Sequence, residues 1–344
     1  GALADAGAVT WASGTVGIVG TVNAPTVNHV KGLTANTSLQ QISVDSTNGN
    51  FYARFVNEVG GVVRVGSQTQ GFDTPIAATL TGAFSGGNFT VTDIDATGKN
   101  NTLTVSRVNV SGVDYYQFSD PNEAFASAPV TTPASVLSNN NKTLQVPTSA
   151  ITGTLTINLQ GGNDTLFADL TSGDVIPNGG LQYLGGTPTA APGDRLIISG
   201  GNQGDVTYNY TSASSGNVAI ANFGTITYTG LEQSISNTGT VADMYVNLAT
   251  AGANAVTLGD DATSGNATSR LSGATLITTD FIDPTGTLTI LRGNAADTFT
   301  FAAAPDFTPA VALGTFPEPF SDVTFSGALT LGVNKGLTAY SSTT

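Results

Sequence analysis

Residues 151–166 read ITGTLTINLQGGNDTL, an alternating run of Thr with Leu or Ile that leads into a glycine turn and an Asp-Thr-Leu step. The same features return in the same order further along the chain. Residues 286–290 repeat the GTLTI of residues 153–157, residues 293–299 (GNAADTF) repeat the turn, and a weaker copy lies at residues 327–332 (GALTLG). A repeated strand–glycine–aspartate unit is typical of stacked coils that bury their apolar faces against one another. It predicts a right-handed parallel β-helix, or solenoid, over residues 143–344.

The rest of the chain also has the pattern of strands. Short alternating or β-branched runs are bounded by turn residues, and no window keeps the i, i+3, i+4 apolar spacing of a helix. In the first part, strands are predicted at residues 16–22, 41–44, 51–56, 61–65, 88–92, 102–108 and 113–118, with a hairpin turn at residues 47–50 (TNGN). The fold class predicted for the whole chain is therefore all-β.

A stretch without alternation separates these two parts. Residues 119–133 (SDPNEAFASAPVTTP) are rich in Pro, Ala and Ser and read as a loop or linker. We therefore predict an N-terminal β domain over residues 1–135, which is sandwich-like, irregular or β-helical, and a β-helix-like repeat domain over residues 143–344. The antiparallel hairpin turns of the first part favour a β-sandwich there.

Charge and composition exclude several classes of function. The chain has 24 acidic and 10 basic residues, a net charge of −14, no Cys and a single His. Binding to nucleic acid needs clustered Lys and Arg, so it is not expected. Thiolate chemistry, disulfides and multi-His zinc sites are excluded by the residue counts, and a Ser–His–Asp triad would depend on His29 alone. No apolar run is long enough for a transmembrane helix.

Carboxylate chemistry is the one catalytic class that the composition leaves open. A glycoside-cleaving site needs two carboxylates about 5 to 10 Å apart. Asp93 and Asp95 would share one face of a strand, and Asp260 and Asp261 are adjacent in a predicted turn. Solvated residues in turns and at sheet edges are the simpler interpretation of both pairs. We therefore predict that the protein is not an enzyme, and keep an Asp-based polysaccharide lyase or hydrolase as an alternative.

From about residue 78 to residue 331, the chain resembles the very large repetitive extracellular proteins common in planctomycetes and some other environmental bacteria. Besides residues 151–166, the resemblance rests on residues 88–95 (NFTVTDID), 101–105 (NTLTV), 185–200 (GGTPTAAPGDRLIISG), 225–232 (TITYTGLE), 258–265 (LGDDATSG) and 283–297 (DPTGTLTILRGNAAD), in this order. The resemblance implies a β-helical, adhesin-like array on the cell surface without assigned chemistry. Residues 1–77 match no family that we can name.

The glycine–aspartate turns also resemble the Ca²⁺-binding nonapeptide repeats of secreted toxins and adhesins. Asp164, Asp174, Asp194 and Asp297 are the candidate calcium ligands, with Asp260 and Asp261 in a further turn. Ca²⁺ takes six to eight oxygen ligands, and the turns of this chain are isolated copies that cannot form a tandem calcium ladder. The alternative is that each Asp caps its own turn by accepting a backbone hydrogen bond. Calcium is thus the one cofactor considered.

These features predict an extracellular structural or adhesive protein, either a subunit or a segment of a filament, surface layer or giant adhesin. It would act by β-sheet self-association with identical subunits or adjacent repeats, because only four Lys protect its sheet edges from pairing. Secretion to the cell surface is expected, and surface glycans are a further class of partner. A calcium-stabilised carbohydrate-binding or adhesion module is the main alternative.

Overall fold

A computed structural model describes residues 8–10, 29–31, 38–45, 50–57, 61–67, 71–72, 78–95, 98–188, 190–263, 265–304 and 306–342. Strands dominate these residues, and the one helical segment among them is the short 3-10 helix η1 (Thr148–Ala150). The all-β prediction is confirmed. The chain forms two compact units, Gly1–Ala77 and Ala78–Thr344.

The smaller unit contains two antiparallel sheets. Its strands are β1 (Ala8–Thr10), β2 (His29–Lys31), β3 (Ser38–Asp45), β4 (Asn50–Val56), β5 (Val62–Ser67) and β6 (Gly71–Phe72). β1 pairs with β2, and β3 to β6 form a four-stranded meander. Alternation along β4 buries Ala53 and Phe55 on one face of this meander. The predicted strand at residues 16–22 and the turn at residues 47–49 lie outside the described residues.

The larger unit consists of two twelve-stranded sheets, here called sheet I and sheet II. Sheet I contains β7 (Ala78–Ser85), β8 (Asn88–Asp93), β11 (Ala124–Phe125), β14 (Leu155–Asn158), β16 (Leu181–Leu184), β18 (Asn202–Tyr210), β19 (Gly216–Ile220), β20 (Gly224–Thr229), β22 (Thr240–Asn247), β26 (Thr287–Leu291), β28 (Ala310–Leu313) and β30 (Leu337–Ala339). Sheet II contains β9 (Thr102–Val110), β10 (Val113–Ser119), β12 (Val136–Ser138), β13 (Thr143–Pro147), β15 (Thr165–Asp169), β17 (Arg195–Ser199), β21 (Ser234–Asn237), β23 (Ala255–Asp260), β24 (Thr268–Gly273), β25 (Leu276–Ile282), β27 (Thr298–Phe301) and β29 (Asp322–Phe325).

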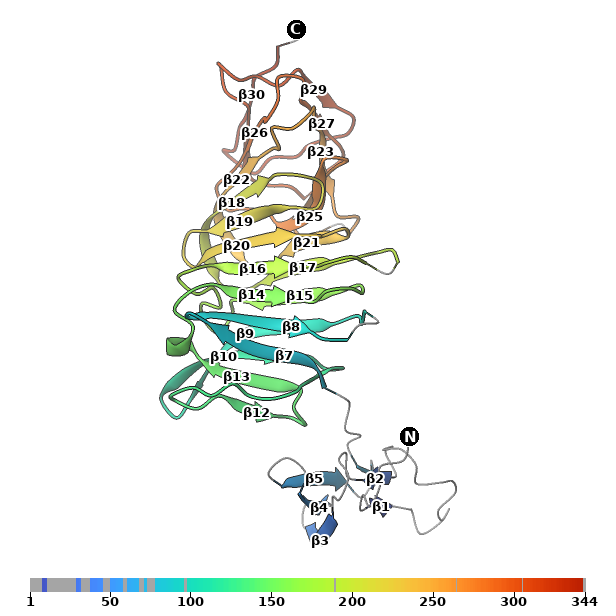
Figure 1. The fold of residues 1–344 in the computed structure, drawn as a ribbon. Coiled ribbons are helices and arrows are strands. Elements are labelled where there is room, and N and C mark those ends of the chain that lie inside the picture. Colours follow the sequence, from blue (N-terminus) through green and yellow to red (C-terminus); the bar gives the residue numbers. More distant parts are fainter. Residues whose placement is uncertain are drawn as a thin grey trace, which may run out of the picture. The chain divides into compact units, whose positions relative to one another are not determined.

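The strands stack one above another as the chain passes repeatedly from sheet I to sheet II (Figure 1). We call a strand of sheet I and the sheet II strand that follows it a rung. β14 lies parallel between β8 and β16, with Leu155 opposite both Phe89 and Leu181. Along β14, Leu155 and Ile157 point into the core, whereas Thr156 lies on the outer face. The period-two pattern of the GTLTI run thus builds a strand with one buried face.

Two antiparallel meanders interrupt this parallel stack. In sheet I, β18, β19 and β20 run antiparallel to one another, and the spatial order is β16-β20-β19-β18-β22. In sheet II, β23, β24 and β25 do the same between β21 and β27. In each meander the first strand therefore lies farthest from the preceding rung, and the third strand pairs with that rung. Chain order and spatial order differ at both places.

The boundary between the units lies at residue 77, not between residues 135 and 143 as the linker-like composition suggested. The hairpins β7–β8 and β9–β10 are antiparallel. However, β8 also pairs in parallel with β14, and β9 with β15, so that both hairpins belong to the same two sheets as the later strands. The residues of a turn indicate how two consecutive strands are connected. They do not indicate which further strand pairs with the other edge of either strand.

One continuous core lies between the two sheets and receives side chains from both. It runs the length of the stack, from Phe125 and Leu144 near its first strands to Phe320 near its last. The GTLTI runs at residues 153–157 and 286–290 occupy equivalent places, because β14 and β26, which they form, both lie in sheet I. The weak copy at residues 327–332 forms no strand, and its Leu329 makes one isolated parallel bridge to Ala304.

Candidate functional site

The conspicuous polar feature of the larger unit is a set of carboxylates buried where the chain enters sheet II. Asp164 directly precedes β15, Asp194 precedes β17 and Asp297 precedes β27. Each of these three residues has an exposed fraction of 0%. A carboxylate that is fully removed from water needs hydrogen-bond partners, since burial without them is costly. Their partners therefore define what these side chains do.

Asp164 and Asp194 belong to a carboxylate ladder, which also includes Glu232 and begins at Asn101. The Asn101 N–H donates to Asp164 Oδ1 at 2.7 Å, and the Asp164 N–H donates to Asp194 Oδ1 at 2.7 Å. The Asp194 N–H in turn donates to Glu232 Oε2 at 3.2 Å. Each carboxylate thus binds a backbone N–H of the preceding rung, and the ladder ties successive rungs together at one corner.

The backbone explains why an acidic residue suits this position. The carbonyl oxygens of Asn101 and Asp164 accept hydrogen bonds from Thr165 and Arg195, the first residues of the next strands of sheet II. The N–H groups of the same two residues, which directly precede β9 and β15, donate to no carbonyl of the neighbouring strand and bind a carboxylate instead. A carboxylate from the following rung supplies the missing acceptor, so these two N–H groups are paired although they are buried.

The second oxygen of both aspartates has no partner among the described residues. Asp164 Oδ2 and Asp194 Oδ2 are buried without a hydrogen bond, and so is the hydroxyl of Tyr183. Burial raises the pKa of Asp164 to about 8, and the carboxylate of Asp194 adds to this. Burial likewise raises the pKa of Asp194 to about 6, with a further contribution from Glu232. Both groups therefore favour the neutral, protonated form far above the ordinary pKa of an aspartate.

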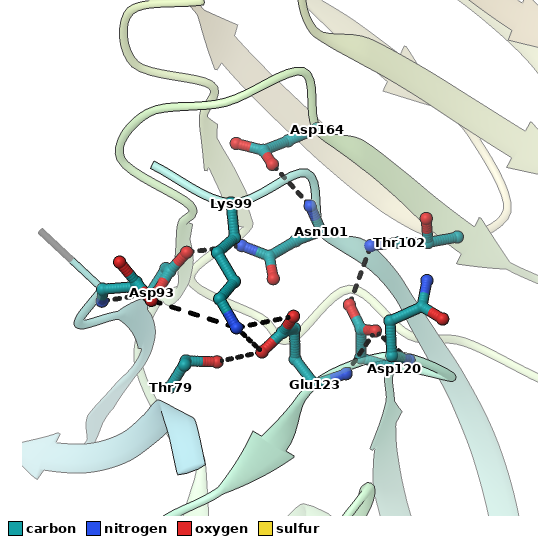
Figure 2. A network of polar contacts seen from close by, with 10 residues as sticks. Thr79, Asp93, Lys99, Asn101, Thr102, Asp120, Glu123 and Asp164 are labelled. Atoms are coloured by element: carbon teal, nitrogen blue, oxygen red, sulfur yellow. Dashed lines mark hydrogen bonds and ion pairs between the residues drawn. The ribbon is translucent and has the colours of Figure 1, made fainter. Parts of the chain in front are cut away.

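A second polar network lies at the start of the ladder (Figure 2). Lys99 Nζ lies 3.1 Å from Glu123 Oε2, which also accepts a hydrogen bond of 2.7 Å from Thr79 Oγ1. The side-chain amide of Asn101 donates to Asp93 Oδ2 at 2.8 Å, while its backbone N–H reaches Asp164. Asn101 therefore joins the two networks. This cluster connects β7, β8 and β9 to the segment that contains Glu123, and so holds the first strands of the stack together.

Asp297 has a different environment from Asp164. Its Oδ1 accepts hydrogen bonds from the backbone N–H and the side-chain amide of Asn254, at 2.7 and 2.9 Å. Its Oδ2 accepts from the N–H groups of Gly293 and Asn294, at 2.8 and 2.9 Å. Both oxygens are saturated by N–H donors. Asp297 thus closes its own turn and binds the neighbouring rung at the same time.

Three of the other candidate aspartates, Asp174, Asp261 and Asp93, accept a hydrogen bond from the backbone N–H two residues later. For Asp174 and Asp261 this is the turn capping that the alternative interpretation of the sequence proposed, whereas Asp93 is buried and not solvated. Asp174 Oδ1 accepts from the Ile176 N–H at 2.8 Å. Asp261 Oδ1 accepts from the Thr263 N–H at 2.8 Å. Asp93 Oδ1 accepts from the Asp95 N–H at 2.7 Å. Asp260 Oδ1 is buried without a partner among the described residues.

Of the four candidate calcium ligands, the fold brings only Asp164 and Asp194 together, and Asp174 and Asp297 lie in separate places. The part of the chain that the structure describes contains no group of three or more His, Asp or Glu side chains arranged to hold a metal ion. Sequence reasoning missed Asn101, Glu232 and Asn254 as members of these networks. A signal existed for Asn101, because Asn101-Thr102-Leu103 has the same form as Asp164-Thr165-Leu166.

Comparison with protein-family models, with curated proteins and with solved structures finds no match to this chain. Separately, the described residues include no helix whose length and apolar character would let it cross a membrane.

Calcium binding at Asp164 and Asp194 is testable through thermal unfolding. At pH 7 we expect the wild-type melting curves in excess CaCl₂ and in EGTA to superimpose. With a pKa of about 8, Asp164 is mostly protonated at this pH, and a neutral carboxylic acid is a poor ligand for Ca²⁺. Asp194, with a pKa of about 6, is mostly ionised, but one carboxylate supplies too few of the six to eight oxygens that Ca²⁺ takes. A ligand that binds only the folded state would raise Tm by mass action. A calcium-dependent rise in Tm that Asp164→Asn abolishes would instead place the predicted calcium site here.

Proposed function

We propose that this chain is a structural protein of an extracellular or cell-surface assembly, which acts through the pairing of sheet edges and not through a reaction centre. In this proposal the larger unit is a right-handed parallel β-helix into which two antiparallel meanders are inserted. The observation that carries the proposal is the end of the stack formed by β29 and β30. There, each sheet ends in an edge strand that follows the line of the core but has no strand beyond it among the described residues.

The side chains at this end continue the columns of the core. Phe325 lies opposite the buried Phe301, and their rings stack at 4.7 Å, yet 53% of Phe325 is exposed. Leu337 lies opposite the buried Val311, and its exposed fraction is 36%. The positions directly before them in the two columns, Phe301 and Val311, are buried. A large apolar side chain in such a position is typical of a surface that receives a partner.

The buried carboxylates support the same function. Asp164, Asp194 and Asp297 hold rungs together and have no exposed surface, so they cannot contact a polysaccharide. Their hydrogen bonds to backbone N–H groups stiffen the turns that connect the sheets. A stack built in this way supplies a rigid rod-like element, which suits a protein whose role is mechanical.

Electron microscopy of the purified full chain tests the proposal. We expect ordered assemblies, such as filaments, sheets or paired rods, because the uncovered apolar columns and the unpaired edges are both satisfied by a further strand. The assemblies should disperse in a denaturant concentration below that needed to unfold the chain. Single monomeric particles at all protein concentrations would contradict the proposal.

A further inference from the structure

We infer that a shallow cavity on the outer face of sheet I binds one sugar unit of a neutral glycan. The cavity, here called the outer cavity, has a volume of about 250 Å³ and lies over β18, β19 and β20. Its lining includes Asp205, Thr207, Ala219, Ala221, Gly224 and Thr225. These strands occupy the middle of their sheet, away from the edge strands of the proposed function (Figure 1). Glycan binding there is therefore a separate activity.

The outer cavity is formed by a row of residues that crosses the three strands. Ala219 on β19 lies opposite Thr207 on β18 and opposite Thr225 on β20. The residues before and after Ala219 on β19 are buried, so Ala219 itself points to the outer face. Ala221 follows β19 and Gly224 begins β20. Because these residues have small side chains or none, the sheet surface is hollowed between the two threonines and Asp205.

The backbone around the outer cavity is already paired within the sheet. β19 pairs with β18 along one edge and with β20 along the other. β18 pairs further with β22, and β20 with β16. A peptide that binds by adding a strand needs a free sheet edge, and these strands provide none. A ligand of the outer cavity must therefore be recognised by side chains.

The charges on this face favour a neutral ligand. The chain has a net charge of −14, and Asp205 adds a carboxylate to the lining, so anions are repelled. One carboxylate supplies too few oxygens for Ca²⁺. The strands around the cavity, β14, β16, β18, β19, β20, β22 and β26, contain two charged residues, Asp205 and Asp243. Their other outward side chains are mostly hydroxyls and amides, which can both donate to and accept from the hydroxyl groups of a sugar.

A row of amide side chains runs beside the outer cavity on the same face. Asn247 Nδ2 donates to Asn209 Oδ1 at 2.6 Å, and Asn209 Nδ2 donates to Asn217 Oδ1 at 2.8 Å. These hydrogen bonds hold the three amides in fixed orientations. Each NH₂ group has a second N–H and each oxygen a second lone pair, so the row presents further donors and acceptors. Binding to groups that are already ordered costs less conformational entropy.

An exposed aromatic ring lies next to the outer cavity. Tyr245 on β22 lies opposite Thr207, and 37% of its surface is exposed. A sugar ring carries hydroxyl groups around its edge and C–H groups on its faces. The Tyr245 ring offers a flat apolar surface to such a face and a hydroxyl at its tip. The volume of about 250 Å³ is below the roughly 300–1,000 Å³ of sites for drug-sized ligands, and suits a single sugar ring.

Isothermal titration calorimetry of the full chain tests the site with three neutral oligosaccharides, cellohexaose, mannohexaose and N-acetylchitohexaose. We expect saturable binding of at least one of them. Ala219→Phe fills the outer cavity with a ring at an outward position, and Phe is readily accommodated in strands. Tyr245→Ala removes the flat apolar surface beside the cavity. Each variant should raise the Kd of the bound oligosaccharide at least about tenfold.

Ala83→Phe is the matched control, because it makes the same change at an exposed position of β7 in the same sheet. This variant should bind as the wild type does, and far-UV circular dichroism shows whether each variant is folded. No saturable binding of any of the three oligosaccharides overturns the inference, and so does a folded Ala219→Phe variant with the wild-type Kd. Tighter binding of a chitosan hexamer, whose amino groups are positively charged, also overturns it by assigning the cavity to a cationic ligand. None of these outcomes alters the electron microscopy result expected for the proposed structural function.

Discussion

Asp164→Asn should raise the free energy of unfolding, and the rise should be several kcal/mol larger at pH 8.5 than at pH 5. In the folded chain, burial raises the pKa of Asp164 to about 8, whereas the ordinary pKa of an aspartate in the unfolded chain is about 3.9. The folded state therefore keeps a proton that the unfolded state has lost between these two pH values. Stability from this group is fully present below about pH 4 and declines as the pH rises through 8.

The expected size of the effect follows from the proton count. While one more proton is bound by the folded state, stability falls by about 1.4 kcal/mol for each unit of pH. Asn carries no ionisable proton, but its side-chain oxygen can still accept the Asn101 N–H bond that Asp164 Oδ1 accepts at 2.7 Å. The variant should therefore lose this part of the pH dependence. Over several units of pH the difference amounts to several kcal/mol, which is large against the stability of a typical domain.

Urea unfolding in EGTA-containing buffers from pH 5 to pH 8.5 measures this difference. Asp114→Asn serves as the control, because it removes the same formal charge from an exposed side chain whose pKa is lowered by its hydrogen bond to Asn109 and by Arg107. Its unfolding free energy should keep the wild-type decline with rising pH. If Asp164→Asn and the wild type show parallel curves over the whole range, the buried carboxylate is not protonated and the assignment fails.

The repeated phrase of the sequence predicted the part of the fold that depends on local pattern. The GTLTI runs at residues 153–157 and 286–290 form β14 and β26 in the same sheet, and their alternation buries one face of each strand. The pairing of distant strands could not be predicted in this way. β18, β19 and β20 look like ordinary successive strands, and only the structure shows that they occupy their sheet in reverse order. Register between rungs depends on contacts far apart in sequence, which single-chain patterns do not record.

The candidate site shows the same division. Glycine followed by Asp-Thr correctly indicated a turn that leads into a strand, and Asp164 and Asp297 both occupy that position. The sequence treats them as two copies of one feature. Their partners come from other rungs and differ: Asp164 meets Asn101 and Asp194, whereas Asp297 meets Asn254 and its own turn. Equal local patterns can therefore have different hydrogen-bond partners.

Asp297→Ala should destabilise the larger unit strongly, by about 3–5 kcal/mol of unfolding free energy. The substitution removes the acceptor for four N–H donors, two from Asn254 and one each from Gly293 and Asn294. Asp297 has no exposed surface, so no water can replace the lost carboxylate without opening the turn. Each buried donor left unpaired costs about 1–3 kcal/mol, less the relaxation of its neighbours. Urea unfolding at pH 7 measures the loss.

Asp297→Asn keeps the shape of the side chain but replaces one acceptor oxygen with an NH₂ donor. An amide can still accept from Asn254 through one oxygen, but its NH₂ group then faces the N–H donors of Gly293 and Asn294, so we expect most of the stability loss to remain. Asp261→Ala, which removes an acceptor at an exposed turn, should cost less than about 1 kcal/mol. Asn substitution is thus expected to stabilise the chain at Asp164 and destabilise it at Asp297 when both are measured at pH 8.5. If the two changes had the same sign, the number of N–H donors around each carboxylate would not be what distinguishes the two positions, and the contrast between Asp164 and Asp297 would be refuted.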